Sequence, residues 1–338
     1  MSKCIDPVLC YDDGKTRKFR HFSLSTPGFK LIHNKVYNCG KCIFCRKRRS
    51  TELATRCVLH ASLYRDNCFL TLTYDETKTG YHNRFDYTDI QKFKKRLRQH
   101  CHREYDGKKI QIFNVHEYGK NGKKHWHLVV FNHDFSTDPE PELERVLHSY
   151  KGDHALYRSP RLETLWPFGY NTVGSVTEAS AMYQAQYTQK DFQNGNVSNS
   201  RKSHSKHSGI GREYFLNNYK QILTLGFIPF NGRKIPIPRY FLKLAHKHYC
   251  HFYEPHYFFD NSRRKRVHTP FADTEPNREI AELFIFHSER RESHLEELHL
   301  EWSDWVWDNY NSKLPPDFLI SGENYLHDLK NRNTNDNF

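Results

Sequence analysis

The strongest constraint on the fold is the run from His125 to Phe131, in which His-Trp-His is followed by four apolar residues. Successive side chains of a β-strand point to opposite faces, so His125 and His127 share one face and Trp126 lies on the other. The apolar run predicts a buried strand that holds both imidazoles rigidly enough to bind one divalent cation. A histidine pair alone is a weak signal among 23 histidines, so its surroundings decide its meaning.

A second strand is predicted directly before this one, over residues 110–117, and residues 119–124 form a turn that makes the two a hairpin. Glu117 ends the first strand where His125 begins the second, so its carboxylate could be a third ligand. His116 is the rival ligand on the opposite face. Two imidazoles and one carboxylate would leave positions open for water and a phosphate oxygen. The alternative is a surface hairpin end with ordinary polar side chains.

The charge of the chain favours a polyanionic partner. Lys and Arg number 52 against 39 Asp and Glu, which gives a net charge of +13 and a pI near 9.2. Aromatic residues make up 15% of the chain. Rings that stack on bases and cations that follow phosphates together suit single-stranded nucleic acid. The alternative is a basic protein whose charges are simply solvated.

The cysteines and the hydropathy pattern bear on the compartment. No apolar run approaches the ~20 residues that span a bilayer, and the amino terminus has no signal-peptide core, so we expect an intracellular protein. Nine clustered cysteines then indicate reduced thiols or metal ligands. An iron–sulfur cluster is disfavoured, because Arg49 stands where the next thiol of such a motif would fall. Plain buried thiols are the alternative to a structural Zn²⁺ bound by Cys39, Cys42 and Cys45, with Cys10 or Cys4 as the fourth ligand.

Other segments read as mixed helix and strand. Strands are predicted over 69–74 and 170–176. Amphipathic periodicity predicts helices over 50–63, from 88 or 89 onward, over 239–248 and over 277–301. The second of these is strongly basic, which fits either phosphate contact or a solvated face. Residues 134–161 read as irregular, with one short helix near 143–150, and residues 191–208 as a mobile basic loop.

A further helix carries a second group of reactive side chains. Ser175 and Glu178 fit a capping box, so a helix is predicted to begin there. Residues four and then three apart share a helical face, so Tyr183, Tyr187 and Lys190 line up. A tyrosine stripe is usually ordinary packing. This stripe ends in lysine and is flanked by glutamines, and a phenol can act as a nucleophile when a cation activates its target.

Together these motifs resemble the HUH endonucleases of the two-tyrosine type, and more closely the rolling-circle replication initiators of microvirus-group, gokushovirus-like bacteriophages. The likeness covers roughly 39–240 and is densest over 69–190. The last hundred residues match no motif of this kind. The motifs that carry it are, in order, Cys39-Gly-Lys-Cys42 with its basic follow-on, Phe69 to Asp75, Glu117-Tyr-Gly119, His125-Trp-His127, Trp166-Pro-Phe-Gly169, Tyr183 to Lys190, Gly209-Ile-Gly211 and Pro238-Arg-Tyr240.

The resemblance implies an α+β fold, with a central antiparallel, RRM-like sheet, helices on one face and a helical carboxy-terminal extension. It implies Mg²⁺ or Mn²⁺ bound by His125, His127 and Glu117. Tyr183 or Tyr187 would attack a phosphate that Lys190 orients, leaving a 5′-phosphotyrosyl link, and the other tyrosine would act after one round of copying. The regions expected are a cysteine-containing region (1–65), the endonuclease core (66–192), a mobile basic loop (193–212), an accessory region (213–320) and a disordered tail (321–338).

The implied partners are a single-stranded or extruded DNA origin and, since no phosphate-binding loop of a motor protein is present, a host helicase with the replication machinery. The implied location is the bacterial host cytoplasm, without membrane contact. Two other functions fit the same residues. One is a non-catalytic, zinc-stabilised single-stranded nucleic-acid-binding protein, which would form no covalent adduct. The other is a metal-dependent nuclease that uses water as its nucleophile.

Overall fold

The computed structural model describes residues 8–12, 17–21, 36–37, 40, 42–77, 86–118, 124–190, 203–204, 209–253, 259–260, 265–266 and 271–290. The chain divides into two compact units. One, the sheet unit, consists of Ile43–Tyr219 and Pro238–Phe241. The other, the terminal unit, consists of Met1–Cys42, Lys220–Ile237 and Leu242–Phe338.

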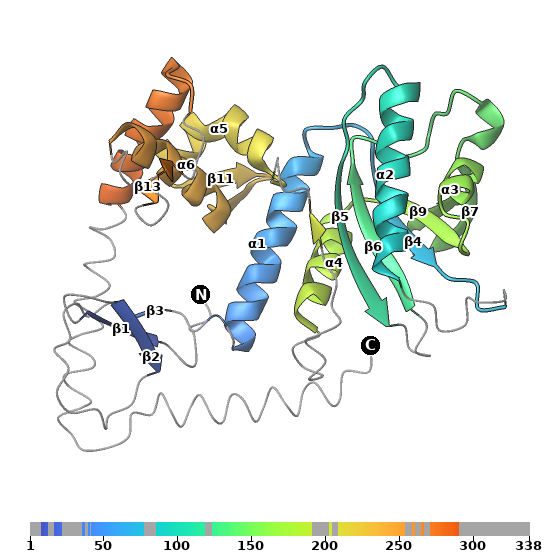
Figure 1. The fold of residues 1–338 in the computed structure, drawn as a ribbon, viewed down its shortest axis with the longest axis horizontal. Helices are drawn as coiled ribbons and strands as arrows, with labels where there is room; N and C mark the ends of the chain where they lie inside the picture. Colours follow the sequence, from blue (N-terminus) through green and yellow to red (C-terminus); the bar gives the residue numbers. More distant parts are fainter. Residues whose placement is uncertain are drawn as a thin grey trace. The chain divides into compact units, whose positions relative to one another are not determined.

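The sheet unit is built on a seven-stranded antiparallel sheet in the order β10-β5-β6-β4-β9-β8-β7 (Figure 1). The His-Trp-His strand is β6, which lies between β5 and β4. The predicted hairpin and the α+β class are therefore confirmed. The strands are β4 (Asn67–Thr73), β5 (Gln111–Tyr118), β6 (Lys124–Phe131), β7 (Val146–Lys151), β8 (His154–Arg158), β9 (Asn171–Ser175) and β10 (Ser203–His204).

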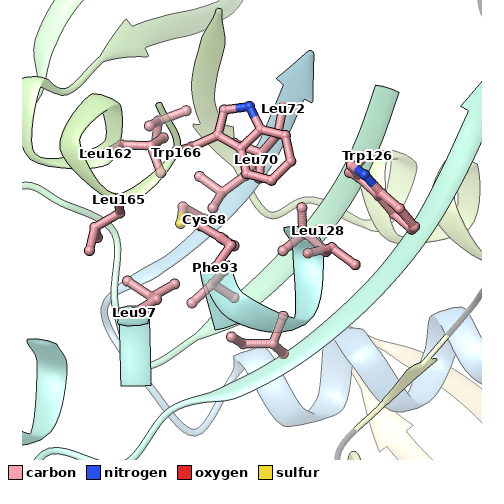
Figure 2. Packing of buried hydrophobic residues seen from close by; sticks show 14 of the residues in the cluster. Cys68, Leu70, Leu72, Phe93, Leu97, Trp126, Leu128, Leu162, Leu165 and Trp166 are labelled. Atoms are coloured by element: carbon pink, nitrogen blue, oxygen red, sulfur yellow. The ribbon is translucent and has the colours of Figure 1, made fainter. Parts of the chain in front are cut away.

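Helices cover both faces of this sheet. On one face, α2 (Tyr87–Glu104) and α3 (Pro160–Leu165) pack on Trp126 and Leu128 of β6, and Figure 2 shows these side chains in one cluster with Phe93 and Leu97 of α2. On the other face, α1 (Ile43–Ala61) and α4 (Glu178–Lys190) pack on the odd-numbered residues of the same strand. The expectation of helices on one face only is wrong, because β6 is apolar on both faces beyond its histidines.

Three helices begin elsewhere than predicted. Helix α1 begins at Ile43 rather than at residue 50, because the Arg-Lys run before residue 50 consists of good helix formers. Helix α2 is capped by Asp86, whose side chain accepts a hydrogen bond from the backbone N–H of Thr88 at 2.8 Å. Helix α4 is capped by Thr177 and Ser180, whose hydroxyls each accept from the other's backbone N–H, at 3.0 and 2.8 Å. The predicted capping box two residues earlier is therefore wrong.

The segment predicted to be irregular contains a β-hairpin. A short 3₁₀ turn, Pro141–Leu143, precedes β7 and β8, which pair in antiparallel fashion in place of the helix predicted near 143–150. All six residues of β7 are exposed, so it lacks the alternation of apolar and polar side chains by which a half-buried strand is recognised.

A tight turn holds the end of β4 beside the histidine strand. The indole N–H of Trp166 donates to the carbonyl of Thr73 at 2.9 Å, and the N–H of Asp75 donates to the carbonyl of Phe168 at 2.9 Å. A Cβ on Gly169 would lie 2.5 to 2.8 Å from backbone atoms of residues 73–75. Only glycine permits this approach, which accounts for the Trp-Pro-Phe-Gly motif.

The terminal unit contains small sheets and helical segments. Its hairpin of β11 and β12 precedes α6, and α5 and α6 each belong in part to both units. Lys220 and Glu279 form an ion pair at 2.9 Å. Residues 275–290 are helical, which confirms the expected carboxy-terminal helix in its described part, whereas 291–301 and the tail from 321 lie outside the described residues. The remaining elements are β1 (Val8–Asp12), β2 (Arg17–His21), β3 (Val36–Tyr37), α5 (Arg212–Leu225), β11 (Phe227–Phe230), β12 (Arg233–Pro236), α6 (Arg239–Phe252), β13 (Phe259–Asp260) and β14 (Lys265–Arg266).

Membrane-spanning segments were also considered. Within the described ranges, no helix combines the length and the apolar character that crossing a bilayer requires.

Candidate active site

Two histidines and a glutamate converge at one end of β5 and β6. The register pairs Glu117 with His125 directly across the two strands. Glu117 Oε2 lies 2.9 Å from His127 Nε2 and 3.3 Å from His125 Nε2. The three potential ligand atoms all lie within 4.8 Å of one another, and among the described residues this is the one group of three metal-binding side chains so arranged.

The opposite face of the hairpin holds the rival third ligand. His116 pairs with Trp126 in the register, and their rings contact each other with centroids 5.8 Å apart. Because side chains alternate along a strand, His116 points away from His125 and His127. The geometry thus brings Glu117, and not His116, to the histidine pair.

The donor set fits a hard divalent cation with mixed nitrogen and oxygen ligands. Two ligands at right angles around an ion, each about 2.1 Å from it, are about 3 Å apart. The distances from Glu117 Oε2 to His127 and His125 match that spacing. Imidazole nitrogens suit Mn²⁺ better than Mg²⁺, while the carboxylate suits both.

A threonine on the neighbouring strand orients His127. Thr71 Oγ1 lies 3.2 Å from His127 Nδ1. When Nδ1 carries the proton and donates to Thr71, the Nε2 lone pair faces Glu117 and is available to a metal. Burial lowers the pKa of His127, against the opposing hydrogen bond from Glu117, so the ring is neutral near pH 7. A neutral imidazole is the form that binds metals.

Helix α4 brings a phenol to the same carboxylate. The hydroxyl of Tyr183 donates to Glu117 Oε2 at 2.9 Å, and its ring contacts that of His127 with centroids 5.6 Å apart. The Tyr183 side chain is 42% exposed, so the phenol is accessible from solvent. The sequence expectation that this tyrosine belongs with the histidine pair is matched by their positions.

The next residue along the helix anchors α4 to the two strands. Gln184 is fully buried, and its amide donates to the carbonyl of Phe113 at 2.7 Å and to that of His127 at 3.4 Å. Two small residues, Ala181 and Ala185, let the helix approach the sheet closely. These contacts fix the rotation of α4, and with it the side on which Tyr183 emerges.

Other candidate residues fall outside what the structure describes. Tyr187 and Lys190 belong to α4, but their side chains lie outside the description. Cys39 lies outside it entirely, and of Cys10 only the backbone of β1 is described. Cys45 is buried and Cys42 half-buried. The zinc site and the roles of the second tyrosine and the lysine remain predictions.

Sequence reasoning missed Thr71 and Gln184. A threonine on the predicted strand over 69–74 was visible, but its alignment with His127 depends on the pairing of β4 with β6, which no local pattern reveals. Gln184 was seen only as a polar neighbour that made the tyrosine stripe a poor core. A glutamine between two alanines on a helix that must meet a sheet was the available signal.

Comparison with known proteins points to one family. Residues 67–192, from β4 to the end of α4, match the model of the Replication-associated protein ORF2 family. The chain is 36% identical over 236 residues to Replication-associated protein ORF4 of Chlamydia phage 1, an alignment that covers 68% of this chain and 58% of that protein. The chain therefore spans less than two thirds of that relative.

Two further relatives carry similar descriptions. Replication-associated protein VP4 of Bdellovibrio phage phiMH2K is 30% identical over 225 residues, covering 63% of this chain and 68% of that protein. Replication-associated protein ORF2 of Spiroplasma virus 4 is 29% identical over 287 residues, covering 78% and 85%. No solved structure matches the chain.

Proposed function

The chain belongs to the family of phage replication-associated proteins, and on that premise we propose that it initiates rolling-circle DNA replication as a metal-dependent, site-specific endonuclease and strand transferase. In this proposal it nicks a single-stranded or extruded origin through a 5′-phosphotyrosyl intermediate and rejoins the ends after a round of synthesis. The relatives are described only as replication-associated, so the chemistry rests on the site.

One observation carries the proposal, namely that a phenol and two imidazoles meet at a single carboxylate oxygen. Tyr183, His125 and His127 all lie within 3.3 Å of Glu117 Oε2. A nucleophile beside a metal-binding triad is the arrangement that displacement at phosphorus requires, because the attacking and stabilising groups must face the same phosphate.

The residues have separable roles in the displacement. His125, His127 and Glu117 would hold Mn²⁺ or Mg²⁺, which when bound supplies polarisation of the phosphate and offsets developing charge. Tyr183 Oη would form the bond to phosphorus as the bond to the 3′ oxygen breaks, which leaves a free 3′-OH after that oxygen takes up a proton. The phenolic proton faces Glu117 Oε2, the acceptor in its hydrogen bond. Thr71 orients His127.

Tyr187 and Lys190 complete the proposed cycle. Tyr187 stands one helical turn after Tyr183, so it could attack the regenerated origin while Tyr183 still holds the first 5′ end. The phosphotyrosyl bond keeps the energy of the phosphodiester, and the strand can be rejoined without ATP. Lys190, on the same stripe, would pair with the phosphate.

The proposal includes its setting. The phages that encode the relatives infect bacteria, and we place the protein in the bacterial host cytoplasm, where a host helicase would separate the strands and host polymerase would extend the 3′-OH. A purified protein that unwound duplex DNA with ATP would contradict the dependence on a helicase.

The test is covalent capture. Purified protein is incubated with Mn²⁺ and labelled single-stranded oligonucleotides tiled across the phage genome that encodes it, and a denaturant-resistant adduct is sought. Wild type is compared with Tyr183→Phe, Tyr187→Phe and the double variant. An adduct that survives one single change and vanishes in the double supports two alternating nucleophiles. Cleavage without an adduct indicates a water-using nuclease, and binding without cleavage a non-catalytic binding protein.

A further inference from the structure

A run of four cations opens α1, and neither the metal triad nor the tyrosines account for it. Lys47, Arg48 and Arg49 are exposed and Arg46 is half-buried. Within the described part of the chain, none of the four has a carboxylate within 4.0 Å. Four adjacent like charges repel one another, so a polyanion would be favoured at this surface.

The direction of α1 puts this run at the active-site end of the sheet. Near the end of α1, the His60 ring contacts that of Phe131, the last residue of β6, with centroids 4.8 Å apart. Arg46 lies 14 residues earlier, about 21 Å along a helix. His125 lies six residues before Phe131, about 20 Å along a strand. The start of α1 is therefore level with the histidine end of β6.

Helix α4 runs the opposite way beside it. It follows Ser175, which pairs with Cys68 at the Phe131 end of the sheet, and reaches the His127 ring at Tyr183. Helices α1 and α4 are in contact along the sheet, and Figure 1 shows the start of α1 beside the end of α4. The cations thus flank the helix turn that carries the tyrosines.

Helical periodicity distinguishes the four cations. Ser50, Ala54 and Cys57 are buried and mark the side of α1 that faces α4 and the sheet. Arg46 is four residues before Ser50 and so continues this stripe toward the end of α4, with Lys47 and Arg49 on either side. Arg48 falls on the opposite side of the helix.

We propose that Arg46, Lys47 and Arg49 form a phosphate-binding patch that holds the backbone of single-stranded DNA as it enters the tyrosine and metal site. The inference rests on the proposed function for the identity of the polyanion. Guanidinium groups suit this role because they pair with phosphate oxygens in a bidentate manner. The basic helix α2 cannot share it, because its exposed Lys92 and Lys95 lie over the other face of the sheet.

The test compares two double variants that remove equal charge. Arg46→Ala with Arg49→Ala alters the patch, and Lys92→Ala with Lys95→Ala is the matched control. Binding of a fluorescein-labelled 30-nucleotide single strand is measured by anisotropy in EDTA over a range of salt concentrations. If each arginine neutralises one phosphate, the patch variant loses about 25-fold in affinity at 0.1 M salt, and the slope of log K against log salt falls by about 1.4.

Conservative and single changes sharpen the result. Arg46→Lys keeps the charge and is expected to keep the salt slope, whereas Arg48→Ala should weaken binding less than Arg46→Ala. Circular dichroism confirms that each variant is folded. Binding by the patch variant that equals binding by the α2 control overturns the inference. Absence of a covalent adduct with wild type overturns the proposed function instead, and the binding comparison still decides the patch.

Discussion

The two faces of β6 differ sharply in chemistry although the same eight residues supply both. On the α2 face, Trp126, Leu128 and Val130 are fully buried in a continuous apolar cluster. On the α4 face, Val129 and Phe131 are equally apolar, but the strand then ends in His127 and His125 beside Glu117. The comparison teaches that the site is an interruption of one core layer, held in place by an uninterrupted layer behind it.

The largest expected effect comes from removing a ligand on the site face. His127→Ala is expected to abolish adduct formation and to weaken Mn²⁺ binding more than about 100-fold, because loss of a ligand exceeds the effect of losing its supporting hydrogen bond. Mn²⁺ binding can be followed by electron paramagnetic resonance. The matched control is His116→Ala, a histidine on the other face. A control that lost Mn²⁺ equally would overturn the assignment of Glu117.

Removal of a core side chain on the other face should do the reverse. Leu97→Ala leaves a cavity in the fully buried α2 cluster and is expected to lower the free energy of unfolding by about 2–5 kcal/mol. Adduct formation per folded molecule should stay near wild type well below the melting temperature. Urea denaturation measures the first quantity and a saturating adduct assay the second. A large loss of adduct in fully folded protein would show that the two faces are not separable.

A structural histidine in the site-face layer gives a pH-dependent contrast with His127. Burial lowers the pKa of His60 to about 4 from its usual 6.5. The folded state therefore resists a proton that the unfolded state accepts, so stability is complete above about pH 6.5 and falls as the pH drops towards 4, by roughly 3 kcal/mol. His60→Leu should flatten this loss in urea titrations at different pH values. An unchanged pH profile would remove His60 as its cause.

The smallest expected effect concerns the support of His127. Thr71→Val keeps the shape of the side chain but removes the oxygen that lies beside His127 Nδ1. Mn²⁺ affinity is expected to fall about 10-fold, with little change in stability. Thr73→Val is the control, because its hydroxyl donates to the carbonyl of Tyr170 and touches no ligand. Equal affinities in the two variants would show that Thr71 does not orient the ring.

The sequence was informative where local periodicity and burial agree. The strand at His125, its hairpin with residues 110–117 and the shared face of Glu117 and the two histidines follow from a period of two and a short turn. The pairing of β4 with β6 is a long-range event, so Thr71 could not be placed beside His127 from the sequence. The exposed hairpin of β7 and β8 lacks apolar alternation and was missed for that reason.

Helix boundaries and helix placement were the weaker predictions. The start of α1 was set too late, because a basic run was read as a preface to the helix rather than as its first turns. That correction places Arg46 on the stripe of Ser50 and Ala54 and so makes the phosphate-binding patch visible. Helices on one face were expected from the resemblance, although the even-numbered residues of β6 already required a second apolar layer.

The most direct test of the central claim is mass spectrometry of the protein after reaction with Mn²⁺ and origin DNA, followed by nuclease and protease digestion. The account predicts that the peptide containing Tyr183 and Tyr187 carries a 5′-linked deoxynucleotide, with fragment ions that place it on one of the two phenols. Cleaved DNA with a 5′-phosphate and an unmodified tyrosine peptide would contradict the account.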